Sequence, residues 1–282
     1  MADVKIIALD LDGTLLTSDK TLSERNFEAL RAAAEQGVEI VPCTGRYYLA
    51  MPEVIRNLPF VRYVITINGA AIADRKEDKL ISETLLPFEE AIAIMEFLDT
   101  QPVVYDCYQG RGGYMTKSMQ DAIESYCNDP HYIKMVRDLR EPVPELKTYL
   151  TEQHADVQKI QFFTLDDELR KRLFTEIPAR FPDLAMSSSM KNNIEINHKN
   201  ANKGTALLAL AAHLGVDRSQ TMAFGDGLND LDMIREAGVG VGMANAKPEV
   251  LQEANVIAPT NDEDGVAAVI EAVLRGESYG AL

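Results

Sequence analysis

Two aspartates stand two places apart near the start of the chain, in the stretch "IIALDLDGTLL" at positions 6–16. The aliphatic residues before them are typical of a buried strand. Side chains two residues apart on an extended backbone point the same way, so Asp10 and Asp12 can serve one site. Carboxylates at the end of a buried strand indicate chemistry, because a buried core does not require them.

Polar residues and glycines also follow the other predicted strands. Ligands of an open parallel sheet bind beyond the carboxyl ends of its strands, so we expect these residues to gather at one edge. After the predicted strands, or beside a helix start in the case of lysine, come Thr44, Gly45, Arg46, Asn68, Gly69, Lys203, Asp226, Asn229 and Asp230.

Gathered carboxylates repel one another, and each pair at about 4 Å costs on the order of 4 kcal/mol at an effective dielectric constant near 20. A hard divalent cation removes this repulsion. An all-oxygen ligand set with few carboxylates suits Mg²⁺, which keeps several waters and binds substrate phosphate. The predicted metal ligands are Asp10, Asp12, Asp226 and Asp230.

Alternating strands and helices are expected to position these residues. Residues 4–10, 38–43 and 63–69 read as apolar strands separated by helical segments, and Thr21 with Glu24 resembles a capping box for the first helix. Residues 202–276 resume the alternation. The pattern predicts an α/β fold with a doubly wound, Rossmann-like parallel-sheet core.

The middle of the chain has a different pattern. A charged hairpin is expected over residues 70–84, then a mixture of helices and strand-turn-strand segments, with "EPVPE" at 141–145 as a linker. These features predict an inserted α+β domain. The predicted boundaries are 1–86 and 189–282 for the core and 87–188 for the insertion.

Charge and composition exclude some functions. The 282 residues carry a net charge of −16, which disfavours nucleic acid and anionic membrane surfaces as partners. No apolar stretch is long enough for a membrane span, and aspartates interrupt any signal peptide. The three scattered cysteines fit reduced thiols in a cytoplasmic protein. The sequence leaves monomer and homodimer undecided.

The motifs "DLDGTL", "TGR", "NKG" and "GDGLND", in this order, resemble the four motifs of the haloacid-dehalogenase superfamily of phosphotransferases. With "NGA" and "GVGMANA" the chain resembles the Cof-type phosphatases, whose C2B-type cap is inserted between the second and third motifs. The long gap from Thr44 to Lys203 agrees with such a cap. The resemblance covers the core more than the insertion.

The resemblance implies a role for each matched residue. Asp10 would be the nucleophile that forms an aspartyl-phosphate, and Asp12 the general acid and base. Thr44 and Lys203 would bind phosphoryl oxygens. Asp226 would ligate Mg²⁺ with Asp10 and the backbone carbonyl of Asp12.

Weaker assignments follow for the remaining motif residues. Asp230 would support the metal directly or through water, and Asn229 would orient the phosphoryl group or Lys203. Gly45, Arg46 and Asn68 are candidate pocket residues, and Gly13 with Thr14 would form a turn into a mobile flap.

The predicted function is Mg²⁺-dependent hydrolysis of small phosphorylated metabolites, such as sugar phosphates or nucleotide-like cofactors. A hexose phosphomutase is an alternative. A receiver-type signalling module also uses Asp, Thr and Lys around Mg²⁺, but Asp12 and the insertion argue against it. The insertion would select the leaving group, with Arg111 and Lys191 as candidates that could equally be solvated.

Overall fold

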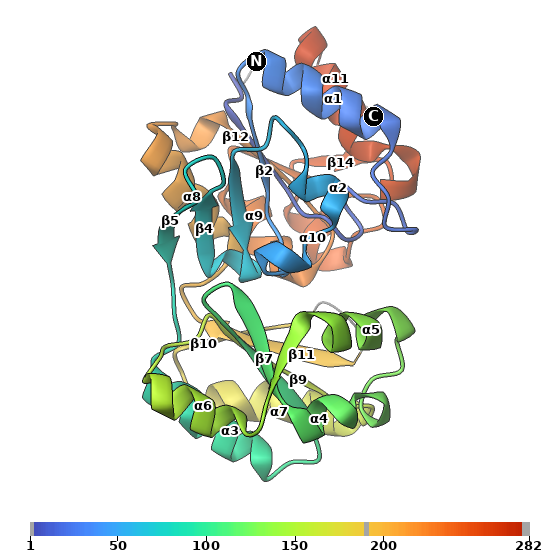
Figure 1. Cartoon of the computed structure of the whole chain (residues 1–282). Coiled ribbons are helices and arrows are strands. Elements are labelled where there is room, and N and C mark those ends of the chain that lie inside the picture. The colour runs from blue at the N-terminus through green and yellow to red at the C-terminus, as the bar shows by residue number, and fades with distance from the viewer. Residues whose placement is uncertain (1–2, 189–191, 278–282) are drawn as a thin grey trace. The chain divides into compact units, whose positions relative to one another are not determined.

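The computed structural model describes residues 3–188 and 192–277, and packing divides them into two compact units. The first unit holds residues 3–45, 52–82 and 202–277, and the second holds 46–51 and the rest of the stretch from 83 to 201. Figure 1 shows the course of the chain within each unit.

The first unit is built on a five-stranded sheet in which every pair of neighbours is parallel, in the order β14-β13-β12-β1-β2. Its strands are β1 (Ile6–Leu9), β2 (Glu39–Pro42), β12 (Thr221–Gly225), β13 (Val239–Met243) and β14 (Val256–Ala258). The residues of β1 are buried on both faces, as the continuous apolar run predicts.

Helices cover both faces of this sheet. On one face, Ile6 and Ala8 of β1 pack against Leu207 of α8. On the other face, Ile7 lies beside residues of α1 and α11. These two helices contact each other (Figure 1). The helices are α1 (Glu24–Glu35), α2 (Glu53–Arg56), α8 (Lys203–Leu214), α9 (Leu231–Glu236), α10 (Pro248–Glu253) and α11 (Gly265–Arg275). Short single turns are η4 (Arg218–Gln220), η5 (Leu228–Asp230) and η6 (Asn261–Glu263).

The expected third parallel strand, β3 (Tyr63–Thr66), joins the sheet through one parallel bridge between Cys43 and Ile65. It pairs antiparallel with β4 (Ala71–Asp74), and β5 (Lys79–Glu83) completes a three-stranded sheet. The turn η2 (Ile67–Gly69) connects β3 to β4. The charged hairpin predicted over residues 70–84 is therefore β4 and β5.

The start of α1 corrects one sequence prediction. Ser23, not Thr21, is the N-cap, and its side chain accepts a hydrogen bond from the backbone N–H of Asn26. Thr21 instead bonds to Thr17. A serine directly before the first helical residue satisfies an orphan N–H more readily than a residue two places further away.

The second unit contains a six-stranded sheet in the order β10-β11-β9-β6-β7-β8. All neighbours are antiparallel except β7 and β8, which are parallel. The strands are β6 (Val104–Gln109), β7 (Gly112–Thr116), β8 (Arg140–Val143), β9 (Lys159–Phe163), β10 (Leu184–Ser187) and β11 (Asn193–His198). The first three residues of the "EPVPE" stretch, 141–143, belong to strand β8. The prediction of a linker there was therefore wrong.

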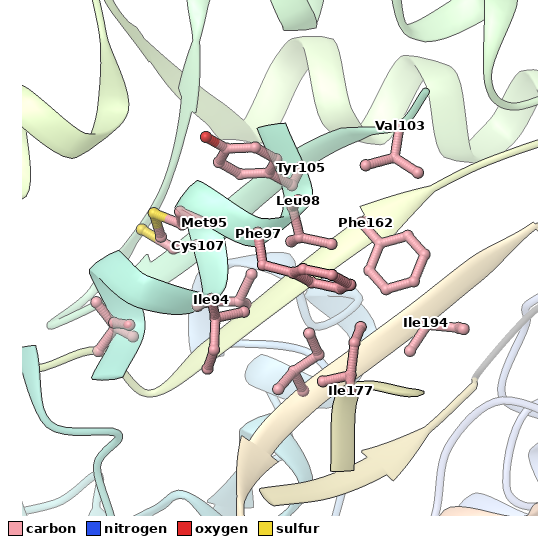
Figure 2. Close-up of a cluster of buried hydrophobic side chains, with 14 of the residues drawn as sticks. Ile94, Met95, Phe97, Leu98, Val103, Tyr105, Cys107, Phe162, Ile177 and Ile194 are labelled. Carbon is pink, nitrogen blue, oxygen red and sulfur yellow. The ribbon is translucent and has the colours of Figure 1, made fainter. Parts of the chain in front are cut away.

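The two faces of this sheet differ in composition. Tyr105, Phe162 and Ile194 face a buried apolar cluster that includes residues of α3, α6 and α7 (Figure 2). The helices and turns of the unit are η1 (Tyr48–Ala50), α3 (Phe88–Asp99), α4 (Lys117–Asp121), η3 (Ile123–Ser125), α5 (Pro130–Leu139), α6 (Leu146–Gln153) and α7 (Asp167–Arg180). The alternate strand residues include Asp106, Lys159 and Glu195, which are polar and still buried.

The predicted fold class, a doubly wound parallel-sheet core with an inserted α+β region, is confirmed by this topology. The predicted domain boundaries at 86/87 and 188/189 stay a prediction. Within the described ranges, every helix is too short or too polar to cross a bilayer.

Candidate active site

Two strand ends bring the first acidic residues together. Parallel pairing places Leu9 opposite Phe224, and the backbone N–H of Asp10 donates to the carbonyl of Phe224 at 3.0 Å. Asp226 follows β12 directly after Gly225. Both carboxylates therefore leave the sheet at the same edge, as the parallel arrangement requires.

A buried lysine joins this edge from helix α8. The ammonium nitrogen of Lys203 lies 2.5 Å from Oδ1 of Asp10 and 2.6 Å from Oδ1 of Asp230. All three side chains are 9% exposed or less. Such short, charge-assisted contacts fix the lysine between two acids from segments far apart in the sequence.

Lys203 is the first residue of α8, and Asn202 caps that helix by accepting from the backbone N–H of Thr205 at 2.8 Å. The N-terminus of the helix therefore lies at the acidic edge of the sheet. The partial positive charge of a helix N-terminus favours anions. A cation and a helix dipole thus offset part of the negative charge here.

Both carboxylate oxygens of Asp230 accept hydrogen bonds. While Oδ1 contacts Lys203, Oδ2 accepts from the backbone N–H groups of Asp226 (3.0 Å) and Gly227 (2.8 Å). Asp230 therefore holds both the lysine and the turn that carries Asp226.

The loop after Asp10 is fitted against Asp226. The hydroxyl of Thr14 donates to Oδ1 of Asp226 at 2.9 Å. Gly13 has a φ of +92°, and a Cβ on it would lie 2.6 Å from Oδ2 of Asp226. The glycine is required both for its backbone conformation and for the close approach of the carboxylate. Asn245 donates to the carbonyl of Gly13 at 2.8 Å, a second contact that holds this turn.

The cluster carries more negative than positive charge. Burial, reinforced by the charge of Asp230, raises the pKa of Asp10 well above its usual value, and the same causes raise the pKa of Asp226 to about 6. Burial alone would lower the pKa of Lys203, but Asp10 and Asp230 raise it above its ordinary value. The lysine is therefore charged, and it cannot balance three acids by itself.

The donor set fits a hard divalent cation. One carboxylate oxygen from each of Asp10, Asp226 and Asp230 lies within 4.8 Å of the others. Oxygen ligands and excess negative charge suit Mg²⁺. The three hydrogen bonds to Asp230 leave Asp10 and Asp226 as the better direct ligands.

The other predicted residues fall into two groups, the first of which lies in the first unit. Asp12 is partly exposed, and its carboxylate lies 2.9 Å from the ammonium of Lys20. Thr44 is buried, and its backbone N–H donates to the carbonyl of Ile65, while Gly45 beside it is half-buried. Asn229 donates to Oδ1 of the buried Asn68 at 3.2 Å.

The second group lies elsewhere. Arg46 packs with the second unit, where its guanidinium donates to the carbonyl of Ala50 at 3.1 Å. Arg111 is the last residue of the turn between β6 and β7, directly before Gly112, also in the second unit. Lys191 lies outside the described residues.

The family follows from comparison with known proteins. The haloacid dehalogenase-like hydrolase model matches residues 7–270. The chain belongs to this family. The predicted Cof-type membership is confirmed, and the polar edge described above lies within the matched range.

Relatives give the class of enzyme. Phosphatase YwpJ of Bacillus subtilis is 30% identical, with 96% of this chain and 100% of the relative covered. The Bacillus subtilis protein named 5-amino-6-(5-phospho-D-ribitylamino)uracil phosphatase YcsE is 30% identical, with 95% of each chain covered. A solved haloacid dehalogenase-like hydrolase structure from B. subtilis superposes with a TM-score of 0.82 at 30% identity, covering 95% of this chain and 99% of that one. The chain is a phosphatase, as predicted.

Cys43 lies near the acidic cluster of this phosphatase and is buried. Burial raises the pKa of its thiol far above the ordinary value. A thiol kept protonated is a poor nucleophile, which agrees with the sequence-based interpretation of Cys43 as a small buried residue.

Sequence reasoning missed the contacts of three residues that shape the candidate site. Thr14 was assigned only to a turn, whereas its hydroxyl bonds to Asp226. Asn202 caps the lysine helix, and Asn245 holds Gly13. Asn202 lies in the motif "NKG" and Asn245 in "GVGMANA". Both motifs were recognised in the sequence, but neither asparagine was assigned a function.

Proposed function

We propose that this phosphatase hydrolyses small phosphomonoesters through an aspartyl-phosphate on Asp10. The observation that carries the proposal is the cluster of three acids in which Asp10 and Asp230 both contact the buried ammonium group of Lys203, while a carboxylate oxygen of Asp226 lies within 4.8 Å of theirs. A carboxylate held by a lysine at 2.5 Å, beside a candidate cation site, is oriented for attack.

In the first step, one oxygen of Asp10 attacks phosphorus in line with the leaving oxygen. The new bond joins phosphorus to Asp10 while the bond to the leaving oxygen breaks. Asp12 donates a proton to that oxygen, so the product leaves as a neutral alcohol. Lys203 and Thr44 donate hydrogen bonds to the transferring phosphoryl group.

In the second step, Asp12 accepts a proton from a water molecule that attacks the aspartyl-phosphate. The bond between phosphorus and the Asp10 oxygen breaks, which releases phosphate and restores the carboxylate. The partial exposure of Asp12 is compatible with this exchange of protons. A general base at this position argues against a receiver module, because it would speed hydrolysis of the phospho-aspartate that such a module must maintain.

Mg²⁺ held by Asp10 and Asp226 would keep both groups ionised and neutralise phosphoryl charge. Thr14 and Asn245 would keep the Asp226 carboxylate and the Gly13 backbone in place around it. Asp230 would act through Lys203 and the backbone of Asp226.

The proposed substrates are small phosphorylated metabolites, either sugar phosphates or nucleotide-like compounds. A relative named for a phosphorylated ribitylaminouracil supports this class. The inserted segment, residues 87–188 by the sequence boundaries, would select the leaving group. We propose a cytoplasmic setting, which the three free, buried cysteines support.

The test is hydrolysis of p-nitrophenyl phosphate with Mg²⁺ by wild type and Asp10→Asn. We expect Asp10→Asn to lower kcat at least ~10³-fold, as loss of a nucleophile does elsewhere. Removing Mg²⁺ with EDTA should abolish activity, and adding it back should restore activity. Full activity of Asp10→Asn would refute the proposal.

Asp74→Asn is the matched control. Asp74 is another buried aspartate of the first unit, and it bonds to Arg62 outside the cluster. Its kcat should stay within about twofold of wild type. A panel of phosphorylated metabolites, with hexose phosphate isomerisation assayed alongside, separates the phosphatase from the mutase alternative.

A further inference from the structure

The turn η2 (Ile67–Gly69) has an unusual backbone. Three successive residues have positive φ angles: 55° at Ile67, 57° at Asn68 and 92° at Gly69. Asparagine and glycine tolerate this region, whereas a β-branched residue in it is a genuine outlier. Such conformations cost about 1–3 kcal/mol and persist only where the surroundings enforce them.

The turn holds the backbone of Thr44 from two directions. The N–H of Asn68 donates to the carbonyl of Thr44 at 3.0 Å, and the N–H of Thr44 donates to the carbonyl of Ile65 at 3.0 Å. Both backbone groups of Thr44 are therefore bonded to the segment that ends β3 and begins η2.

The turn η2 also contacts the start of helix α8, whose first residue is Lys203. A Cβ on Gly69 would lie 2.3 Å from the carbonyl oxygen of Asn202. Asn202 is the N-cap of α8, and Lys203 is its first helical residue. Close backbone contact at this point fixes where α8 begins.

The third contact is made by the side chain of Asn68. Its Oδ1 accepts from Nδ2 of Asn229 at 3.2 Å, and Asn229 directly precedes Asp230, which bonds to Lys203. One buried turn thus touches the segments that carry Thr44, Lys203 and Asn229. These segments are far apart in the sequence, so no local structure sets their spacing.

We propose that Asn68 is a positioning residue that sets Thr44, Lys203 and Asn229 relative to one another, rather than a pocket residue that reads the substrate. Its backbone bonds the Thr44 loop, its side chain bonds Asn229, and its left-handed conformation brings Gly69 against the Lys203 helix. The inference rests on the proposed function, in which these groups bind the transferring phosphoryl group.

Asn68→Gly isolates the side chain, because glycine keeps the positive φ and the backbone N–H while the amide is lost. We expect kcat for p-nitrophenyl phosphate to fall about tenfold or more, since a displacement of about 1 Å in a positioned group can cost ~10²-fold. The unfolding temperature should change little. Wild-type kcat would overturn the proposal.

A double-mutant cycle with Asn229→Ala separates positioning from a general structural role. If Asn68 acts through Asn229, the double variant should lose no more kcat than the worse single variant. Multiplying losses would show independent roles and overturn the proposal. Asp78→Gly, another non-glycine residue with positive φ (47°), is the matched control and should keep wild-type kcat.

Wild type and Asp10→Asn are assayed in the same series. An active wild type with inactive Asp10→Asn upholds the proposed function whatever the Asn68 variants do, so a wild-type kcat in Asn68→Gly would then refute the positioning role alone. An inactive wild type or an active Asp10→Asn would refute both.

Discussion

Each unit of the molecule buries charged side chains, and the two groups are balanced differently. In the first unit, Lys203 contacts Asp10 and Asp230 while Asp226 lies close by, so three carboxylates share one cation. In the second unit, Arg140 lies 2.8 Å from Asp106, with both side chains fully buried.

The second unit contains another buried ion pair of one cation and one carboxylate. Lys159 lies 3.4 Å from Glu195, and these side chains are 1% and 2% exposed. Arg140 also donates to the hydroxyl of Tyr108 at 2.6 Å. In each of these two pairs one positive charge faces one negative charge, whereas the cluster of the first unit has more carboxylates than ammonium groups. Charge balance therefore distinguishes the candidate catalytic site from buried pairs that hold a sheet together.

The largest effect is expected at Lys203. Lys203→Met removes the ammonium that contacts both acids and leaves three carboxylates without a cation of their own. We expect kcat with Mg²⁺ to fall at least ~10²-fold, as for loss of a preorganised charge at a reacting centre. Steady-state kinetics and circular dichroism would check this.

Lys203→Arg is the conservative comparison for that experiment. Its wider, planar head cannot occupy the same buried position between two oxygens, so we expect little recovery. A Lys203→Met protein with near wild-type kcat would contradict the view that the unbalanced cluster is catalytic.

A smaller effect, on stability, is expected in the second unit. Arg140→Met leaves the Asp106 carboxylate buried and unpaired, which costs about 3–5 kcal/mol. Adding Asp106→Leu should recover most of that loss, because replacing a buried pair by apolar groups is close to neutral. Urea unfolding of the single and double variants measures both quantities.

The exposed pair of Arg172 with Glu176 in the same unit provides the control. Arg172→Met should change stability by less than ~1 kcal/mol, as exposed ion pairs do. If Arg140→Met were equally mild, the buried pair would not hold the unit together and the comparison would fail.

The smallest effect is a pH dependence of the metal-free protein. The pKa of Asp226 is raised to about 6 by burial and by Asp230. The native state therefore binds more protons than the unfolded state between about pH 4 and 6, and this contribution to stability is lost as pH rises through about 6. A pKa raised by about two units corresponds to a loss of at most about 3 kcal/mol.

Unfolding temperatures in EDTA across this pH range would measure that loss. Asp226→Asn should flatten the fall, since an amide does not titrate, and Mg²⁺ should stabilise wild type most at the upper end of the range. An identical slope in Asp226→Asn would show that the carboxylate is not under electrostatic strain.

Much of the fold could be predicted from residue patterns. Buried apolar runs such as "VKIIALD" identified strands, and Gly37 and Gly215 marked helix ends close to where α1 and α8 stop. The failures were local. Ser23 rather than Thr21 caps α1, and the strand Arg140–Val143 pairs with β7 although a linker was predicted there and Pro142 lies within it. An edge strand tolerates proline because half its backbone groups need no partner.

The candidate site was predicted in part. Asp10, Asp226, Asp230 and Lys203 do come together, while their catalytic roles stay proposals. The bond from Thr14 to Asp226 and the packing of Arg46 with the second unit were not foreseen. Both depend on which side chains meet across the fold, and motif spacing carries no record of that.

Residue types and motif order identified the candidates for the chemistry and predicted that they share an edge, because polar residues that follow parallel strands must leave the sheet on the same side. How the charges of the site are paired follows from the folded structure alone. Both oxygens of Asp230 accept hydrogen bonds, which leaves Asp10 and Asp226 as the candidate cation ligands, and Asn68 bonds to the segments that carry Thr44 and Asn229. Hydrogen bonds and charge balance depend on distances of a few ångströms between remote segments, and those distances are set by packing.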